Sequence, residues 1–407
     1  SLHDALPISS SFYEQNVGAM GLQQQKLFRV QQQLATNSKF LSAGDDPVGA
    51  ARSLGVSQTL SENAQYATSR QRASLALSTE ENALNSVTSI LQNIKTLTVN
   101  AGNGTLTDAD RASLATTIQS AYDQLVGVAN SDDGNGQFLF AGFKSGSPPF
   151  VTGPGGGVQY VGDQGQRLMQ VDVARQMSTG DDGRSIFQSV QGGAGYVASS
   201  SASNTGSGVF GAIGITDATA PNYGKDFTIS FNGGNYTVMT KDVPPVVAGA
   251  GAYTAGSPID FGGVQLKFTG KPADGDSFDV STAQNAGTDV FAAIGQLVTA
   301  LRTPLAGGGE AAQAQLQNAL ATANRKVTNA HDNVLTVLSS VGSRQTEIDS
   351  LDSGGAARKL QEESYLSSIE DLDPYSAIAE FYQRQSSLQA TQMTFAKLNS
   401  ISLFNYL

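Results

Sequence analysis

The two ends of this chain carry the same kind of amphipathic pattern, and each pattern is only half complete. Apolar side chains recur every seventh residue at both ends, whereas the second column of each heptad is mostly Gln, Ser and Asn. The apolar columns are Tyr13, Met20, Leu27, Leu34 and Leu41 near the N-terminus, and Phe381, Leu388 and Phe395 near the C-terminus. A heptad seam ordinarily needs two apolar columns to bury itself. Neither terminal helix should therefore be stable alone, and both should gain stability when other copies pack around them.

The composition permits a large folded protein and excludes several functional classes. The chain has 407 residues, enough for two or three domains, and 39% of them are hydrophobic. A net charge of -11 without a Lys/Arg cluster argues against nucleic-acid binding. The absence of cysteine excludes disulfides and thiolate sites. There is no run of 18 apolar residues and no apolar segment after a basic start, so we expect neither a membrane span nor a cleaved secretory signal.

Three compositional zones predict a mainly helical fold with a β-rich insert. We expect long antiparallel coiled-coil helices from both chain ends, a rod-like helical domain and a central outer β domain. The predicted inner layer combines residues 9–46 with 365–407. The predicted rod combines residues 47–145 with 286–364, and the outer insert covers residues 146–285.

Local capping chemistry predicts several helix starts. Asp46–Pro47 and Asp373–Pro374 each place a capping carboxylate before a proline at the first helical position. Thr107 and Asp110 form a capping-box pattern before a third helix, which should pair with the preceding one as an antiparallel hairpin. A long periodic apolar pattern follows residue 316, and we expect Gly354–Gly355 to end that helix before a shorter one over residues 356–368.

The middle zone has alternating segments bounded by Gly and Pro, which predict β-hairpins. Residues 227–231 and 236–239 flank Asn-Gly-Gly, a strong hairpin signal. Residues 264–268 and 277–280 predict a second hairpin in the same way. The Gly- and Ser-rich segment 191–208 predicts a flexible loop.

Four blocks of sequence carry recognisable motifs: one surrounds Asp45-Asp46-Pro47, a second surrounds residues 129–142, a third is residues 275–278, and the last is the ending of the chain from residue 388. These blocks resemble the hook-associated protein 3 family of bacterial flagella, which belongs to the flagellin superfamily. The signature residues are Asp45, Asp46, Pro47, Phe138, Phe140 and Gly142. Residues 1–8 depart from the family's usual lead, so we expect them to be foreign to it and derive no fold from them.

The resemblance implies a structural flagellar protein rather than an enzyme. Such proteins are exported by the flagellar export apparatus with a chaperone and without a cleaved signal peptide. They form a ring of subunits on hook-associated protein 1, outside the cell, and act as a mechanical adaptor on which flagellin assembles at the hook-filament junction. This implies no cofactor and no membrane insertion. The alternatives are flagellin itself and, from another class, an adhesin or carbohydrate-binding module in the β insert.

The half-complete patterns predict where copies would meet. A folded-back helix pair within one chain would also satisfy the periodicity, but the family resemblance favours contacts between subunits. The expected interface residues are Met20, Leu27, Leu34, Phe381, Leu388, Phe395, Leu403, Phe404, Tyr406 and Leu407.

Residues that could carry chemistry have simpler structural interpretations. His331 lies in the long apolar pattern and is more readily a packed side chain than a general base. The run 132–136, Asp-Asp-Gly-Asn-Gly, lacks the spacing and the final acidic residue of a calcium loop and therefore predicts a turn. We expect no catalytic, metal or cofactor site.

Overall fold

The computed structural model describes residues 5–154 and 157–400, with side chains described from Tyr13 to Lys397. It divides into two compact units, Ser1–Thr68 with Ser350–Leu407 and Ser69–Asp349. Two long helices, α2 (Pro47–Ala101) and α6 (Gly309–Glu370), contribute residues to both units. The three-part division predicted from the sequence is a different grouping, and it stays a prediction.

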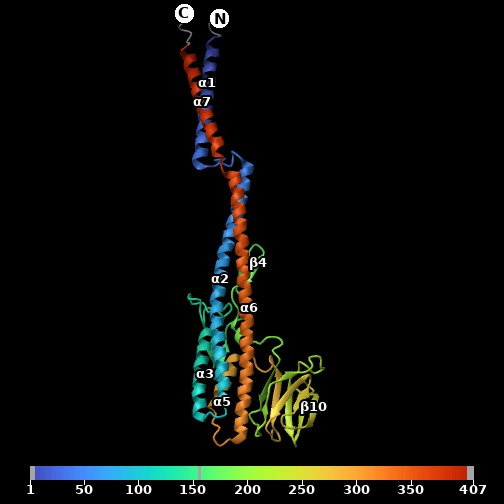
Figure 1. The fold of residues 1–407 in the computed structure, drawn as a ribbon. Coiled ribbons are helices and arrows are strands. Elements are labelled where there is room, and N and C mark those ends of the chain that lie inside the picture. Colours follow the sequence, from blue (N-terminus) through green and yellow to red (C-terminus); the bar gives the residue numbers. More distant parts are fainter. Residues whose placement is uncertain (1–4, 155–156, 401–407) are drawn as a thin grey trace. The chain divides into compact units, whose positions relative to one another are not determined.

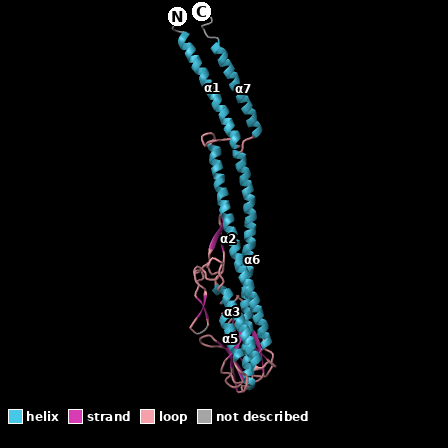
Figure 2. Cartoon of the chain, turned by 90° about the vertical axis from the view of Figure 1, so that its left-hand side faces the viewer, coloured by secondary structure: helices cyan, strands magenta, loops and turns pink. Residues whose placement is uncertain are grey.

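The first unit contains the two terminal helices and the adjoining turns of α2 and α6. Helices α1 (Ala5–Thr36) and α7 (Pro374–Ser400) lie side by side in Figures 1 and 2. α1 ends because Asn37 adopts a left-handed φ of 52°, which the helix cannot continue through. Leu41 therefore lies in the connection that follows, so the expectation that it extends the helical column is wrong.

Helix α6 runs without a break through Gly354 and Gly355, so the predicted helix end and separate helix over 356–368 are wrong. Neither glycine has a positive φ, the backbone conformation that a glycine needs to end a helix. The carbonyl of Gly355 accepts a hydrogen bond from Asn63 Nδ2 of α2 at 2.9 Å. A glycine in a helix interior costs about 1 kcal/mol relative to alanine, which this long helix tolerates.

The helical part of the second unit has complete apolar columns. It consists of α2 and α6 together with α3 (Asp108–Ala129), the short α4 (Gly183–Phe187) and α5 (Val290–Arg302). Leu77, Leu84, Leu91, Val87 and Ile94 of α2 are all 0% exposed. α3 begins with the predicted capping box, in which Thr107 and Asp110 bond each other's backbone N–H groups, and Figures 1 and 2 show it running back alongside α2.

The strands of the second unit form two small hairpins and a two-sheet sandwich. The hairpins pair β1 (Phe150–Thr152) with β2 (Val158–Tyr160) and β3 (Leu168–Asp172) with β4 (Arg175–Ser178). One sheet of the sandwich has the order β10-β9-β8-β13-β5, and the other has β11-β12-β6 with β7 also on β12. Their bounds are β5 Tyr196–Ser200, β6 Val209–Phe210, β7 Gly214–Ile215, β8 Phe227–Asn232, β9 Asn235–Thr240, β10 Val247–Ala252, β11 Pro258–Phe261, β12 Val264–Thr269 and β13 Ser277–Thr282.

The first predicted hairpin is confirmed and the second is wrong. β8 and β9 pair in register around Gly233 and Gly234, whose φ values of 58° and 76° fit a tight hairpin turn. β12 and β13, however, belong to different sheets. Their inward side chains meet across the core, with the rings of Phe268 and Phe278 4.7 Å apart, so the two strands pack face to face rather than edge to edge.

The segment predicted to be a flexible loop, 191–208, contains β5, whose first three residues are buried. Helix α6 covers this edge strand and its surroundings with polar side chains. Thr322 Oγ1 donates to the Ala198 carbonyl at 2.8 Å, and Asn318 Nδ2 donates to the Gly208 carbonyl at 2.9 Å. Because these bonds satisfy backbone groups that an exposed sheet edge would leave open, the segment is ordered by a helix far away in sequence.

Candidate assembly surface

The predicted interface residues of α1 and α7 lie where the two helices meet. The rings of Tyr13 and Phe395 are 5.3 Å apart at 47°. Met20, Leu27 and Leu34 continue the column of Tyr13 at heptad spacing, and Phe381 and Leu388 continue that of Phe395. All five are half-buried. The helix pair therefore covers its apolar columns only in part. The expected terminal contacts Leu403, Phe404, Tyr406 and Leu407 lie outside the described residues.

Very little of this helix pair is fully covered. Among the described side chains of α1 and α7, only Val30 and Ala377 are buried, at 4% and 6% exposure. Gln24, Gln31 and Gln385, which occupy the second column, are exposed. Two helices of this length normally need a continuous buried seam to stay associated. The pair thus has the incomplete seam that its sequence pattern indicates.

The outer faces of the same helices carry large exposed apolar side chains that the heptad pattern did not single out. They are Leu22 (58% exposed), Phe28 (60%), Tyr375 (88%), Tyr382 (63%) and Met393 (70%). Several large apolar side chains exposed on one helix pair are more than the single scattered ones of an ordinary surface, and they favour a contact with another molecule. We name these five residues the outer apolar set. Their signal in the sequence was the presence of large apolar residues, three of them aromatic, at positions where a lone helix pair would have polar ones.

The signature Asp45-Asp46-Pro47 shapes the turn between α1 and α2. The Asp45 carboxylate accepts the backbone N–H groups of Leu41 at 3.0 Å and Ser42 at 3.2 Å, and it pairs with Arg29 at 3.0 Å. The hydrogen bond from Leu41 is the largest cause that lowers the pKa of Asp45 below its ordinary value. Asp46 caps α2 by accepting the Gly49 N–H at 2.9 Å, as predicted, and Pro47 is the first helical residue.

The two connections of the first unit are bonded to each other. Lys39 N donates to the Glu370 carbonyl at 2.8 Å, and Leu372 N donates to the Asn37 carbonyl at 3.2 Å. The Lys39 ammonium also donates to the Ser368 carbonyl at 2.7 Å. Because both connections are held together at the backbone, the register between α1 and α7 is fixed at one end of the pair.

The other signature residues, Phe138, Phe140 and Gly142, are structural parts of the second unit. Phe140 is 0% exposed, its ring meets Phe187 edge-on at 5.7 Å, and its carbonyl accepts the Gly183 N–H at 2.8 Å. Phe138 N donates to the Ser145 carbonyl at 2.8 Å. Gly142 has a φ of 68°, and a Cβ there would lie 2.3 Å from the Asp163 carbonyl oxygen. A side chain at position 142 is therefore excluded twice, by conformation and by space.

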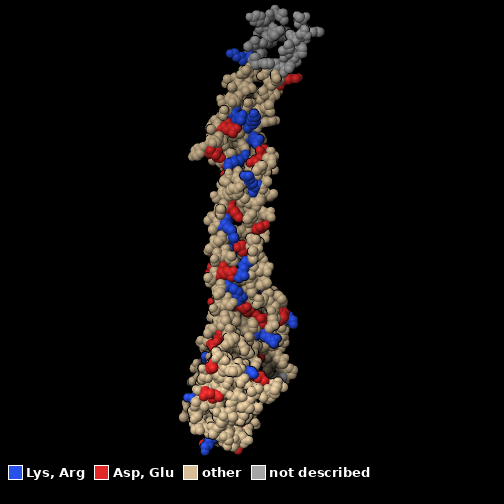
Figure 3. Space-filling view, turned by 90° about the vertical axis from the view of Figure 1, so that its right-hand side faces the viewer, with Lys and Arg blue, Asp and Glu red and all other residues tan. Residues whose placement is uncertain are grey.

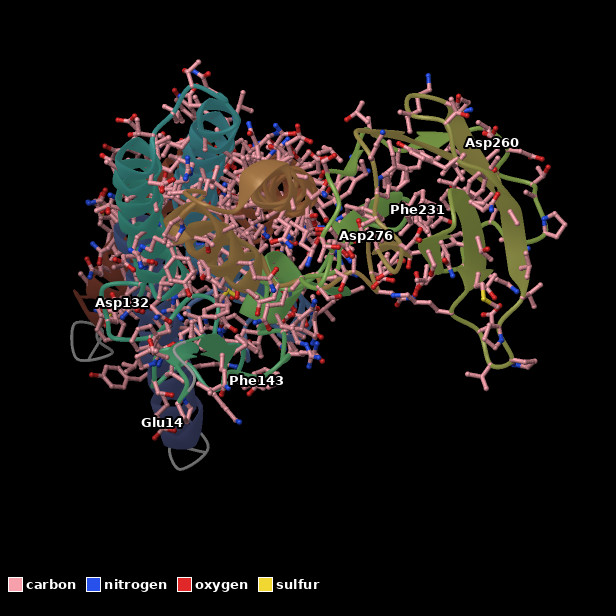
Figure 4. All side chains as sticks on the ribbon, turned by 90° about the horizontal axis from the view of Figure 1, so that it is seen from below. Glu14, Asp132, Phe143, Phe231, Asp260 and Asp276 are labelled. Carbon is pink, nitrogen blue, oxygen red and sulfur yellow. The ribbon has the colours of Figure 1, made fainter. Side chains whose placement is uncertain are left out.

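The motif Gly275-Asp-Ser-Phe278 contributes Phe278 to the sandwich core and a buried carboxylate at Asp276. Asp276 is 1% exposed, and its carboxylate accepts the N–H groups of Thr205 at 2.8 Å, Gly206 at 3.1 Å and Ala273 at 2.8 Å. Figure 4 labels Asp276 and the core residue Phe231 among the strands of this part. Three backbone donors on one buried carboxylate tie together two loops that are far apart in sequence.

The residues considered for chemistry have structural roles. His331 is 8% exposed, and its Nε2 lies 3.3 Å from the amide nitrogen of Gln92 on α2. Asp132 and Asp133 accept the N–H groups of Gly134 at 2.7 Å and Asn135 at 2.9 Å, the geometry of an Asx turn. The described part of the chain contains no cluster of three or more His, Cys, Asp or Glu side chains that could hold a metal ion.

Charges of both signs are mixed on the face of the molecule that Figure 3 shows. Figure 3 shows Lys and Arg side chains interspersed with Asp and Glu over the face in view. Within the described residues, no helix is apolar over a stretch long enough to cross a bilayer. The candidate surface is thus the outer apolar set with the half-buried columns behind it.

Comparison with known proteins places these features in a family. The model of the bacterial flagellin N-terminal helical region matches residues 12–145. Flagellar hook-associated protein 3 of Salmonella typhimurium is 30% identical over 392 residues, which cover 96% of each chain. The crystal structure of flagellar hook-associated protein 3 from Legionella pneumophila is similar with a TM-score of 0.69 and 25% identity, and covers 77% of this chain and 98% of that one.

The match to flagellin is much shorter. Flagellin of Clostridium tyrobutyricum is 30% identical over 118 residues, which cover 29% of this chain and 31% of that protein. The names of these relatives are those of flagellar components and not of enzymes. Full-length similarity distinguishes the junction proteins from flagellin, and this chain belongs to the flagellar hook-associated protein 3 family.

Proposed function

We propose that this chain is the subunit of a ring at the hook-filament junction, where it acts as a mechanical adaptor between hook-associated protein 1 and flagellin. Family membership supports the location. The observation that supports assembly is the poor coverage of the α1/α7 pair: among its described side chains two are buried, while eight large apolar ones are exposed. A ring of copies would cover both the half-buried columns and the outer apolar set, and would thus complete the seam.

In this proposal the interface residues predicted from the sequence and the outer apolar set have different roles. Met20, Leu27, Leu34, Phe381, Leu388 and Phe395 set the pairing of α1 with α7 and become fully buried on assembly. The outer apolar set makes the contacts with neighbouring copies. Apolar burial contributes about 25 cal/mol per Å² of surface removed from water, so covering these side chains would favour association of neighbouring copies.

The poor coverage also supports a delay of assembly until after export. With few buried contacts, α1 and α7 in a lone subunit are marginally stable, which suits passage through the export apparatus with a chaperone and limits early polymerisation. The proposed place of action is the extracellular flagellum.

The test uses isolated hooks that carry hook-associated protein 1. Purified protein is expected to bind to their tips, stop at a short ring and permit flagellin to polymerise. Leu388→Asp and Phe28→Asp should each prevent tip binding, whereas Leu360→Asp, at an exposed α6 position outside both sets, should bind normally. Tip binding by Leu388→Asp equal to that of the wild type would refute the interface.

The same experiment distinguishes a ring subunit from the alternative, that this chain is flagellin. If the purified protein polymerised into long filaments without a hook, the chain would be a filament subunit.

In cells, deletion of its gene is expected to leave hooks in place while flagellin is shed into the medium, and retention of filaments would contradict the proposal.

A further inference from the structure

A buried carboxyl group in the second unit lies where the β3–β4 hairpin is fastened to the long helices. Glu80 of α2 is 2% exposed. Its Oε1 accepts the backbone N–H of Asp181 at 3.0 Å, whereas its Oε2 is enclosed and has no hydrogen-bond partner. An ionised carboxylate in such a place would lack most of the hydrogen bonds that stabilise its charge.

The hairpin and the residues after it, 168–182, form a segment that we name the clasp. Arg70 of α2 donates to the Val171 carbonyl at 3.0 Å. From α6, Glu347 accepts two hydrogen bonds from Arg175 at 2.6 and 2.8 Å, and Arg344 donates to the Ser178 carbonyl at 3.2 Å and pairs with Asp181. Figure 1 shows β4 beside these two helices. The clasp therefore contacts both long helices through charged side chains.

The charged groups around Glu80 decide its preferred state. Asp181 of the clasp presents a like charge, while Arg344 of α6 and Arg167, which precedes β3, present opposite charges whose effect is smaller than that of burial. Burial, followed by the Asp181 charge, raises the pKa of Glu80 to about 8. Near neutral pH the group is a neutral carboxylic acid.

We propose that the clasp is a proton-dependent latch, which stays closed on α2 and α6 while Glu80 is protonated and loosens when Glu80 loses its proton. On ionisation the buried Glu80 carboxylate has the like charge of the partly buried Asp181 close by, and opening the clasp lets water reach Glu80. The direction follows from linkage: the closed state holds a proton up to a higher pH than the open state, so rising pH favours opening.

Hydrogen–deuterium exchange of the full-length protein tests the latch. After correction for intrinsic rates, exchange in residues 168–182 is expected to rise on the order of 30-fold between pH 6.5 and pH 9, because an open Glu80 with its ordinary pKa binds no proton over that range. Glu80→Gln, which is neutral at both pH values, should show little rise. Glu81→Gln is the matched control: it removes a neighbouring charge that binds Gln345 and should behave like the wild type.

A flat profile in the wild type, or an undiminished rise in Glu80→Gln, would overturn the proposal. Carbon-13 NMR of protein labelled at glutamate carboxyls gives an answer even if Glu80→Gln folds poorly. One carboxyl resonance of the wild type is expected to titrate near pH 8. The absence of any glutamate carboxyl that titrates above pH 6.5 would equally exclude the latch.

Discussion

The α1/α7 pair and the helical part of the second unit use the same kind of apolar periodicity, yet they bury it very differently. In the second unit, α2 alone contributes Leu77, Leu84 and Leu91 at 0% exposure, packed within the chain. In the first unit, Leu27 and Leu388 hold matching heptad positions and stay half-buried. One region therefore completes its core with its own residues, whereas the other has an incomplete seam, which we propose neighbouring copies complete.

The difference predicts unequal costs for the same substitution. Leu84→Ala should destabilise the second unit by about 3 kcal/mol, because it removes a fully enclosed side chain and leaves a cavity. Leu27→Ala, at a half-buried position, should lower the free energy of unfolding of the monomer by less than about 0.5 kcal/mol. Urea unfolding of both variants measures this contrast. Equal losses would mean that the α1/α7 pair is as well packed in the monomer as the bundle.

Backbone constraints should also be strong in the second unit. Gly142→Ala should cost about 2 kcal/mol or more, because position 142 has a left-handed φ and the Asp163 backbone fills the space of a Cβ. Gly127→Ala in α3 is the control, since nothing lies within 4 Å of its Cβ position, and it should stabilise slightly by helix propensity. Thermal unfolding compares the two. A neutral Gly142→Ala would show that the signature glycine is not a packing requirement.

Loss of a helix cap should lower the stability of the second unit by a smaller amount. Thr107→Ala should cost about 1 kcal/mol because it removes the capping box of α3, and Thr116→Ala, in the exposed middle of the same helix, should be close to neutral. Chemical denaturation of the second unit within the full chain measures both. A cost for Thr116→Ala as large as that for Thr107→Ala would contradict a capping role.

The turn of the first unit should respond to acid and not to alkali. Hydrogen bonds from Leu41 and Ser42 help to lower the pKa of Asp45 below its ordinary value. The ionised carboxylate therefore stabilises the turn fully at pH values above the ordinary pKa of Asp, and this stabilisation is lost as the pH falls through the lowered pKa. Exchange at Leu41 and Ser42 should rise at low pH in the wild type, and Asp45→Asn should lose that dependence. An unchanged acid response in Asp45→Asn would assign it to another group.

Local chemistry explains why parts of the fold could be predicted. Asp46–Pro47, Asp373–Pro374 and the Thr107 box act within four residues, and each begins a helix in the structure. Pairing between distant segments was not predictable in the same way. β12 and β13 have equivalent alternation, but whether they meet edge to edge or face to face depends on β5, β6 and β11.

The candidate surface was predicted only in part for a related reason. A heptad template finds the column that includes Leu27 and Leu388, but it ignores Phe28 and Tyr382 on the outer faces. Glu80 could not be found at all, since a single Glu in a helix pattern ordinarily lies in solvent. Only the position of the clasp and of Asp181 shows that it is enclosed.

Hydrogen–deuterium exchange of α1 and α7, measured first in the soluble monomer and then on hook tips, tests the central claim most directly. In the monomer, amides of α1 and α7 are expected to exchange about a thousandfold faster than amides around Leu84, and assembly should bring strong protection to both helices. If α1 and α7 were already as protected in the monomer as the core of α2, the incomplete seam would not require neighbours, and the account would be wrong.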